Sequence, residues 1–158
     1  MESTVSLSLV PLREADLQEA CQFIVEGREW SPRSDTFVPP MAVIGHPDSR
    51  WLSALEGDAL VGVVGFHSLN MVDRVGEMFT AVVPKWRGRG VSIPLVKAQL
   101  DYGFNTLNLR RITMTTLAGS PSAKIATKLN VPLEGTFKRA RYKGGTYYDA
   151  LAFAIERP

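Results

Sequence analysis

Two glycines, Gly88 and Gly90, separate a run of strand-forming residues from a run with helical periodicity, and this junction constrains the fold most. Residues 75–83 have the composition of a β-strand. Pro94 falls in the first turn of the expected helix, where a missing amide hydrogen costs little. Apolar residues then recur at helical spacing, namely Ile93, Val96, Leu100 and Phe104. The sequence therefore predicts a strand, a glycine-rich turn and a helix in direct succession.

Such a junction is a candidate anion-binding site. Its glycines let backbone N–H groups point inward, and the helix dipole adds positive potential. Arg87 and Arg89 contribute formal charge beside it. A dinucleotide-binding fingerprint would need a third glycine where Ile93 stands, and a Walker A loop would need a lysine where Val91 follows Gly90. Neither of these two nucleotide-binding loops therefore fits.

The patterns along the rest of the chain alternate strands with helices. A hairpin signal at Glu56-Gly57-Asp58 joins the second and third strands, so strands two to four are expected to form an antiparallel meander. Strands are expected over residues 5–10, 51–55, 60–69, 75–83, 111–116, 134–143 and 146–155, and helices over 14–26, from 93 onward, and after Ser120-Pro121. This order predicts an α/β fold, a mixed and mostly antiparallel sheet flanked by helices.

Residues 28–50 break every regular period, apart from a short helix expected over 41–44. Long connections in compact domains often carry function. Trp30 and Phe37 could form a wall of a substrate site, or could pack this segment onto the core. Recognition of a substrate is expected to depend on this segment and on the last hairpin.

Length and composition define the broad class of protein. A chain of 158 residues can bury a core, and one domain spanning residues 1–158 is expected. No apolar run approaches the ~18 residues of a membrane span, and the first residues lack the features of a secretory signal. A cytoplasmic location without membrane contact is therefore expected. Cys21 is the only cysteine, so an intrachain disulfide is excluded, and its helical spacing predicts a buried apolar role.

The charged residues and histidines argue against two further classes. The net charge of +2 is too small to predict a nucleic-acid partner, because such binding needs basic residues concentrated on one face. His46 and His67 lack the acidic cluster that a metal site would need. Neither a nucleic-acid partner nor a bound metal is expected.

Three segments in order resemble one family. The turn matches the acetyl-CoA signature R/Q-x-x-G-x-G/A at Arg87, Gly90 and Ser92. The downstream run Ser122-Ala123-Lys124-Ile125-Ala126-Thr127-Lys128-Leu129 resembles a helix that many members share, and Glu134-Gly135 with Gly145-Thr146-Tyr147-Tyr148-Asp149 resembles their closing hairpin. The chain thus resembles the general control N-acetyltransferase (GNAT) superfamily from about residue 60 onward, most closely its ribosomal-protein N-terminal acetyltransferase-like branch.

The resemblance implies an enzyme that moves acetyl from acetyl-CoA to a primary amine by direct transfer. The acceptor it implies is a small amine, a protein N-terminus or a lysine. In that family the fourth strand splays from the fifth and pairs with the pantetheine arm, and a homodimer is common. The residues implied for the cofactor are Val82 and Val83 for the arm, and Arg87, Gly88, Arg89, Gly90, Val91 and Ser92 for the diphosphate.

The resemblance leaves the catalytic groups less defined. Ser122 matches a serine that lies near the CoA sulfur, although a serine at a helix start can equally satisfy backbone groups. Glu77 lies near the position of catalytic glutamates, but a solvent-facing role fits as well. Asp149 either lines the acceptor site or ties the hairpin. Gly119 replaces the usual asparagine, Ser92 replaces Gly/Ala and could cap the helix, and Asn130 replaces a glycine at a left-handed helix end.

Two alternatives stay open. The chain could be a CoA-binding module without catalysis, which would bind acetyl-CoA and release no thiol. It could also acylate a nucleic-acid-linked amine, using the basic run Lys138, Arg139, Arg141 and Lys143. Strand alternation would place Arg139, Arg141 and Lys143 on one face, where they meet an anion or are solvated.

Overall fold

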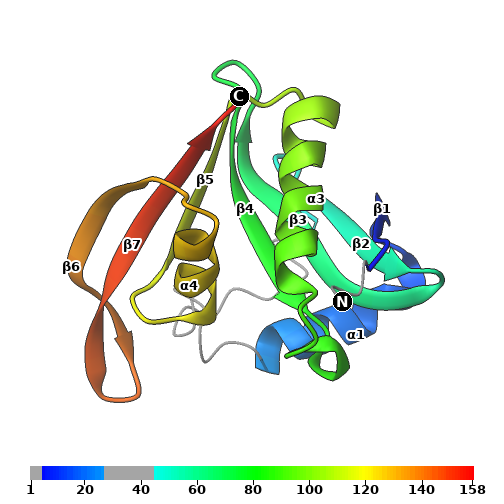
Figure 1. Ribbon diagram of the computed structural model, residues 1–158, viewed down its shortest axis with the longest axis horizontal. Coiled ribbons are helices and arrows are strands. Elements are labelled where there is room, and N and C mark those ends of the chain that lie inside the picture. Colours follow the sequence, from blue (N-terminus) through cyan, green and yellow to red (C-terminus); the bar gives the residue numbers. More distant parts are fainter. Residues whose placement is uncertain (1–4, 27–44) are drawn as a thin grey trace.

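The computed structural model describes residues 5–26 and 45–158. Seven strands in these ranges form one sheet, in the order β1-β2-β3-β4-β5-β7-β6 (Figure 1). The strands are β1 (Ser8–Pro11), β2 (Arg50–Glu56), β3 (Ala59–Asn70), β4 (Val75–Val82), β5 (Arg111–Leu117), β6 (Leu133–Lys143) and β7 (Thr146–Glu156). The helices are α1 (Glu14–Glu26), the 3-10 turn η2 (Pro84–Trp86), α3 (Ser92–Asp101), the π-helix η3 (Tyr102–Thr106) and α4 (Pro121–Lys128).

The element order matches the one predicted from the patterns, and the antiparallel meander of β2, β3 and β4 is confirmed. Asn130 adopts φ +55°, which confirms the left-handed helix end expected there. Residues 28–44 of the predicted irregular connection lie outside the described residues, and so do Trp30, Phe37 and the short helix expected over 41–44. No helix in the described ranges is long and apolar enough to cross a membrane.

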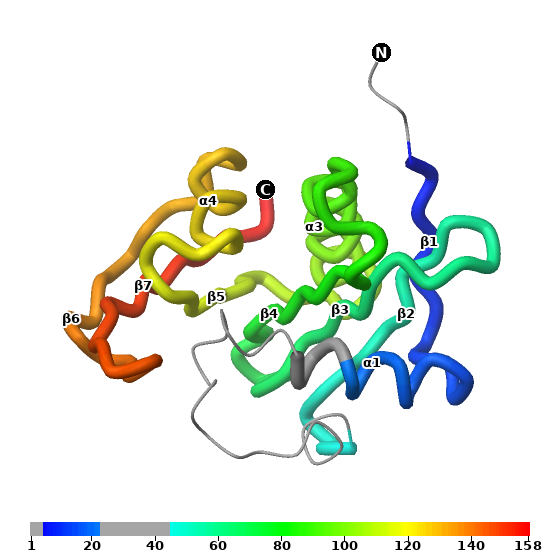
Figure 2. Tube along the Cα trace, turned by 90° about the horizontal axis from the view of Figure 1, so that it is seen from below, coloured from blue at the N-terminus to red at the C-terminus, as the bar shows by residue number. Residues whose placement is uncertain are grey.

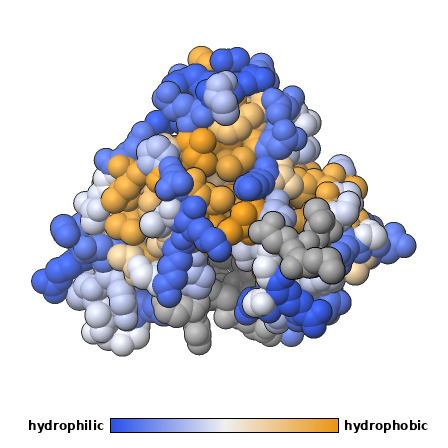
Figure 3. Space-filling view, viewed as in Figure 1, coloured by the Kyte–Doolittle hydropathy of each residue, from blue (hydrophilic) through white to orange (hydrophobic). Residues whose placement is uncertain are grey.

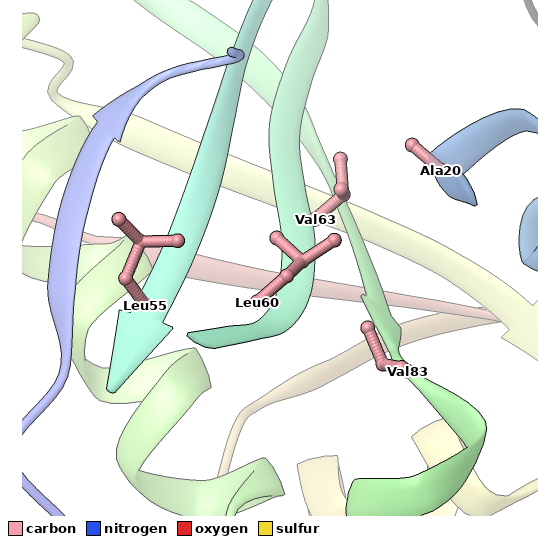
Figure 4. Packing of buried hydrophobic residues seen from close by; sticks show 5 residues of the cluster. All are labelled: Ala20, Leu55, Leu60, Val63 and Val83. Carbon is pink, nitrogen blue, oxygen red and sulfur yellow. The ribbon is translucent and has the colours of Figure 1, made fainter. Parts of the chain in front are cut away.

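Helices cover both faces of the sheet, with α1 on one face and α3 and α4 on the other (Figure 2). Successive residues of a strand point to opposite faces, and neighbours in β3 accordingly join different cores. Val63 packs with Ala20 of α1 and with Val83, as Figure 4 shows, whereas Val64 packs with Leu95 of α3. Each helix is thus held by its own apolar layer.

The helix that follows the glycine turn lies close to the sheet because of one glycine. Gly103 lies in η3, where a Cβ atom would come within 2.7 Å of Ile112 Cδ1 and 2.8 Å of Phe66 Cζ. Any side chain there would force Ile112, Phe66 or the helix itself to shift. Phe66, Phe104 and Ile112 close the core around it.

Pairing between β4 and β5 is short, and this shapes the functional part of the fold. These parallel neighbours pair only at Val75↔Arg111, Gly76↔Ile112 and Glu77↔Thr113. Beyond Glu77 the two strands diverge, as Figure 1 shows, although β5 continues to pair with β7 as far as Leu117↔Ala150. A gap therefore opens within the sheet along the second half of β4.

Candidate functional site

The free edge of β4 presents backbone groups to the gap. The Val83 N–H donates to the Val61 carbonyl over 2.9 Å. Val83 and every second residue before it in β4 therefore point their backbone groups toward β3. Because bonding direction alternates along an antiparallel strand, the N–H and C=O groups of Thr80 and Val82 face the gap. Unpaired backbone groups at a strand edge are a template for an extended ligand. Figure 3 shows apolar side chains over the middle of the face that carries α3 and α4.

Val82 and Val83, the two residues expected to pair with a pantetheine arm, point their backbone groups in different directions. Val83 is buried, its N–H is bonded to Val61, and its carbonyl accepts from the Trp86 N–H over 2.8 Å. The prediction for Val83 is therefore corrected, since its backbone groups are engaged within the chain and face away from the gap. The Val82 carbonyl does face the gap, where it accepts a hydrogen bond from Arg87 Nε over 3.1 Å.

A buried glutamine of α3 holds the backbone of β4 next to this edge. Gln99 projects from α3, and its side-chain amide donates to the carbonyls of Gly65 on β3 and Phe79 on β4, over 2.8 and 2.9 Å. Its Oε1 accepts from the Thr80 hydroxyl over 2.5 Å. Gln99 is completely buried. Its position four residues after the buried Leu95 falls outside the apolar set Ile93, Val96, Leu100 and Phe104 that predicted the helix, so the periodicity carried no signal for its role.

The glycine turn has the conformation that its sequence requires. Gly88 and Gly90 adopt φ +72° and +75°, a region where any other L-residue is strained. A Cβ atom at either position would meet nothing within 4 Å. Backbone conformation, rather than space, therefore explains these two glycines.

The start of α3 leaves its first N–H groups for an external partner. Val91 is the N-cap residue, and no side chain in the described part of the chain caps this end. The capping role expected for Ser92 is therefore corrected, because Ser92 is the first helical residue. The first turn carries no acidic residue, while Arg87 and Arg89 are exposed beside it. Arg89 lies over the Trp86 ring at 5.6 Å, so this end of the helix suits an anion.

Glu77 lies where the gap begins. It shares a strand face with Ala81, which packs against the α1-side core, so its side chain lies on that side of the sheet. His67 is its cross-strand neighbour, with His67 Nδ1 3.9 Å from Glu77 Oε2. The two side chains are 14% and 26% exposed, which leaves the carboxylate accessible at the apex of the gap.

Ser122 lies on α4, on the other face of the sheet. The backbone of this helix start is satisfied by Ser120, which is buried and accepts from the Ala123 N–H over 3.2 Å. Ser120 also exchanges a hydrogen bond with the Thr116 hydroxyl over 2.8 Å. The structural role considered for Ser122 therefore belongs to Ser120, as the Ser120-Pro121 pattern predicted, and Ser122 is exposed.

Strands β6 and β7 form the closing hairpin. The Asp149 carboxylate of β7 bonds to β6, and the basic run of β6 contains a bulge. Asp149 accepts from the Arg139 N–H over 2.8 Å and from Lys138 Nζ over 3.2 Å, and these bonds lower the pKa of its carboxyl. Arg139 has φ +48° in an irregular stretch of β6, and its guanidinium lies 5.5 Å from the Tyr147 ring. Arg141 instead pairs with Tyr148, the residue that follows Tyr147 in β7. Successive residues of a strand point to opposite faces, so Arg141 and Arg139 lie on different faces. The single basic face expected from alternation was therefore wrong.

A free β4 edge that leads through a glycine turn into an uncapped helix is the geometry that the resemblance implied. The sequence model of the family described as the acetyltransferase (GNAT) domain matches residues 6–131. This chain belongs to the GNAT acetyltransferase family. Its finer resemblance to the ribosomal-protein branch stays a prediction.

Relatives and solved structures agree with this assignment. The chain is 26% identical over 111 residues to the uncharacterized N-acetyltransferase YoaA of Bacillus subtilis, covering 69% of this chain and 63% of YoaA. It is 27% identical over 109 residues to the spermidine N(1)-acetyltransferase of Escherichia coli K12, covering 68% and 58%. These matches span less than two thirds of either relative. A Vibrio cholerae spermidine N-acetyltransferase, solved with CoA and spermine, has the same fold, with a TM-score of 0.80, 21% identity and 95% of each chain covered.

Proposed function

We propose that this GNAT domain is an N-acetyltransferase that moves acetyl from acetyl-CoA to a primary amine. The observation that carries the proposal is the free edge of β4, which leads directly into the glycine turn and the uncapped start of α3. An extended arm and a diphosphate lie next to each other in CoA, as the edge and the turn do here. The residues proposed to bind this donor are Val82, Arg87, Gly88, Arg89, Gly90, Val91 and Ser92.

Acetyl-CoA supplies a thioester, in which an attacking amine replaces the sulfur as the C–N bond forms and the C–S bond breaks. Glu77 is proposed to accept the proton that the amine loses, since its accessible carboxylate lies where the gap begins. Ser122 is proposed to donate a proton to the leaving thiolate from the α4 side and to regain one from solvent, to which Glu77 releases the proton of the amine. Positioning of the two reactants supplies much of the rate in such transfers, so few side chains need perturbed chemistry.

The acceptor is proposed to be a small primary amine. The relative from Escherichia coli carries the name spermidine N(1)-acetyltransferase, and the Vibrio cholerae neighbour was solved with spermine. The accessible Glu77 carboxylate also suits a cationic amine, which binds near a negative charge and then loses its proton. A protein N-terminus or lysine is the competing acceptor class.

A thiol-release assay with acetyl-CoA tests the transfer directly. The acceptor panel comprises spermidine, spermine, free amino acids and a short peptide with a free N-terminus. We expect amine-dependent thiol release that is strongest with a small amine and absent without acceptor. Donor binding without release across the panel would instead identify a CoA-binding module without catalysis, and strongest release with the peptide would replace the small-amine proposal.

A further inference from the structure

Arg87 bonds to the backbone oxygen that a pantetheine arm would need. The turn η2 reverses the chain, with the Trp86 and Arg87 N–H groups bonded to the Val83 and Pro84 carbonyls over 2.8 and 3.2 Å. This reversal brings the Arg87 side chain back along β4. Its Nε then donates to the Val82 carbonyl over 3.1 Å. The same residue thus serves the turn and covers the strand edge.

The geometry makes the two uses of Val82 competitive. The Val82 carbonyl points away from β3, so the guanidinium and the amide of an incoming arm approach the oxygen from the same gap. A guanidinium is a broad planar group with donors on three nitrogens. A carbonyl oxygen has two lone pairs, but a group of this breadth lies on the side from which the arm approaches, so the arm competes with it for the Val82 oxygen.

We infer that Arg87 is a donor-specificity residue that makes access to the Val82 edge depend on a diphosphate. This inference rests on the proposed function. A guanidinium forms stronger, bidentate bonds with phosphate than with a neutral carbonyl. When a donor with a diphosphate binds, the Arg87 guanidinium leaves the Val82 carbonyl and bonds to the diphosphate. A donor that ends at pantetheine takes over the Val82 carbonyl but gives the displaced Arg87 guanidinium no anionic partner. The domain consequently favours CoA thioesters over pantetheine thioesters beyond the direct contribution of the phosphate contact.

The test compares two donors and three proteins. S-acetylpantetheine carries the thioester and the arm of acetyl-CoA without the diphosphate. Its dissociation constant and that of acetyl-CoA are measured by NMR titration for the wild type, Arg87→Met and Lys85→Met. Methionine keeps much of the arginine volume and cannot donate to Val82. Lys85 is an exposed cation of η2 outside the proposed donor site, so Lys85→Met removes the same charge from this turn.

The inference predicts opposite changes for the two donors. Arg87→Met should weaken acetyl-CoA binding and strengthen S-acetylpantetheine binding about two- to tenfold, the factor that corresponds to one hydrogen bond. Lys85→Met should not strengthen S-acetylpantetheine binding. Unchanged, weaker or undetectable S-acetylpantetheine binding by Arg87→Met would overturn the inference, and so would an equal gain in Lys85→Met. If the wild type fails to bind acetyl-CoA, the proposed function itself fails, which is a separate result.

Discussion

Glu77 lies opposite Thr113 in the last backbone pair between β4 and β5. Beyond this pair no further pairing joins the two strands, and the edge of β4 is free. The backbone of Glu77 is therefore fixed at the point where an extended donor chain between the strands would end. His67 on β3 flanks it from the other side.

Glu77→Gln should lower kcat by about 100-fold or more, the usual contribution of a general base, with little change in acetyl-CoA affinity. Steady-state kinetics with acetyl-CoA and a small amine provide the measurement. Glu56→Gln, at the end of β2, is the matched control and should keep the wild-type kcat. A Glu77→Gln enzyme with normal kcat would remove Glu77 from the mechanism.

Alanine substitutions at Ser120 and Ser122 should have different effects, the first on the stability of the fold and the second on turnover. Ser120→Ala loses the cap of α4 and a bond to Thr116, and should cost about 1–2 kcal/mol of unfolding free energy. Ser122→Ala should change stability by less than about 0.5 kcal/mol, as is usual for an exposed site, and should lower kcat. Urea unfolding and thiol-release kinetics on both variants provide the test. Normal turnover in Ser122→Ala would exclude it as the proton donor.

Gly90→Ala should weaken acetyl-CoA binding about tenfold, since a left-handed backbone costs a non-glycine residue about 1–2 kcal/mol. Nothing lies near the added methyl group, so only the backbone conformation of the turn is perturbed. Gly135→Ala is the control, because that glycine also has open space and no positive φ. The affinities come from calorimetric titration, and equal effects of the two substitutions would argue against a role for the turn.

Asp16 should make the stability of the fold depend on pH in the acidic range. Hydrogen bonds from Arg13, over 2.5 and 2.9 Å, lower the pKa of this buried carboxyl, burial opposes the shift, and the Ser53 hydroxyl over 2.7 Å adds to it. Because the pKa is lower in the folded state, the stabilisation is complete above the ordinary pKa, about 4. It is lost as the pH falls from there through the folded-state pKa. Asp16→Asn should therefore flatten the acid dependence.

Urea unfolding at pH 7 and at pH 3 compares the wild type, Asp16→Asn and the exposed control Glu19→Gln. The wild type and Glu19→Gln should lose similar stability on acidification, and Asp16→Asn should lose less. An equal loss in all three proteins would show that Asp16 does not link folding to pH.

Local signals in the sequence predicted much of this architecture. The glycines at 88 and 90 and the Ser120-Pro121 pair act through their own backbone preferences, so their positions could be predicted without tertiary information. The apolar periods of β3 and α3 predicted elements that were found. The family motif then implied that the end of β4 pairs with the arm of the cofactor.

Features that depend on register could not be predicted in the same way. Whether Val82 or Val83 faces the gap is decided by the pairing of Val83 with Val61, and a slip of one residue would exchange them. The bulge at Arg139, which divides the basic run between two faces, likewise has no periodic signature. Gln99 reads as a polar residue on a helix until the sheet carbonyls beneath it are located.

Calorimetric titration of the wild-type chain with acetyl-CoA is the decisive measurement. We expect saturable binding to one site, with a dissociation constant below about 1 mM, the upper end of the usual range of KM values. Arg87→Met should weaken this binding, whereas Lys85→Met should leave the single-site stoichiometry intact. An absence of saturable heat up to that concentration would contradict the assignment of the β4 edge and the glycine turn to CoA.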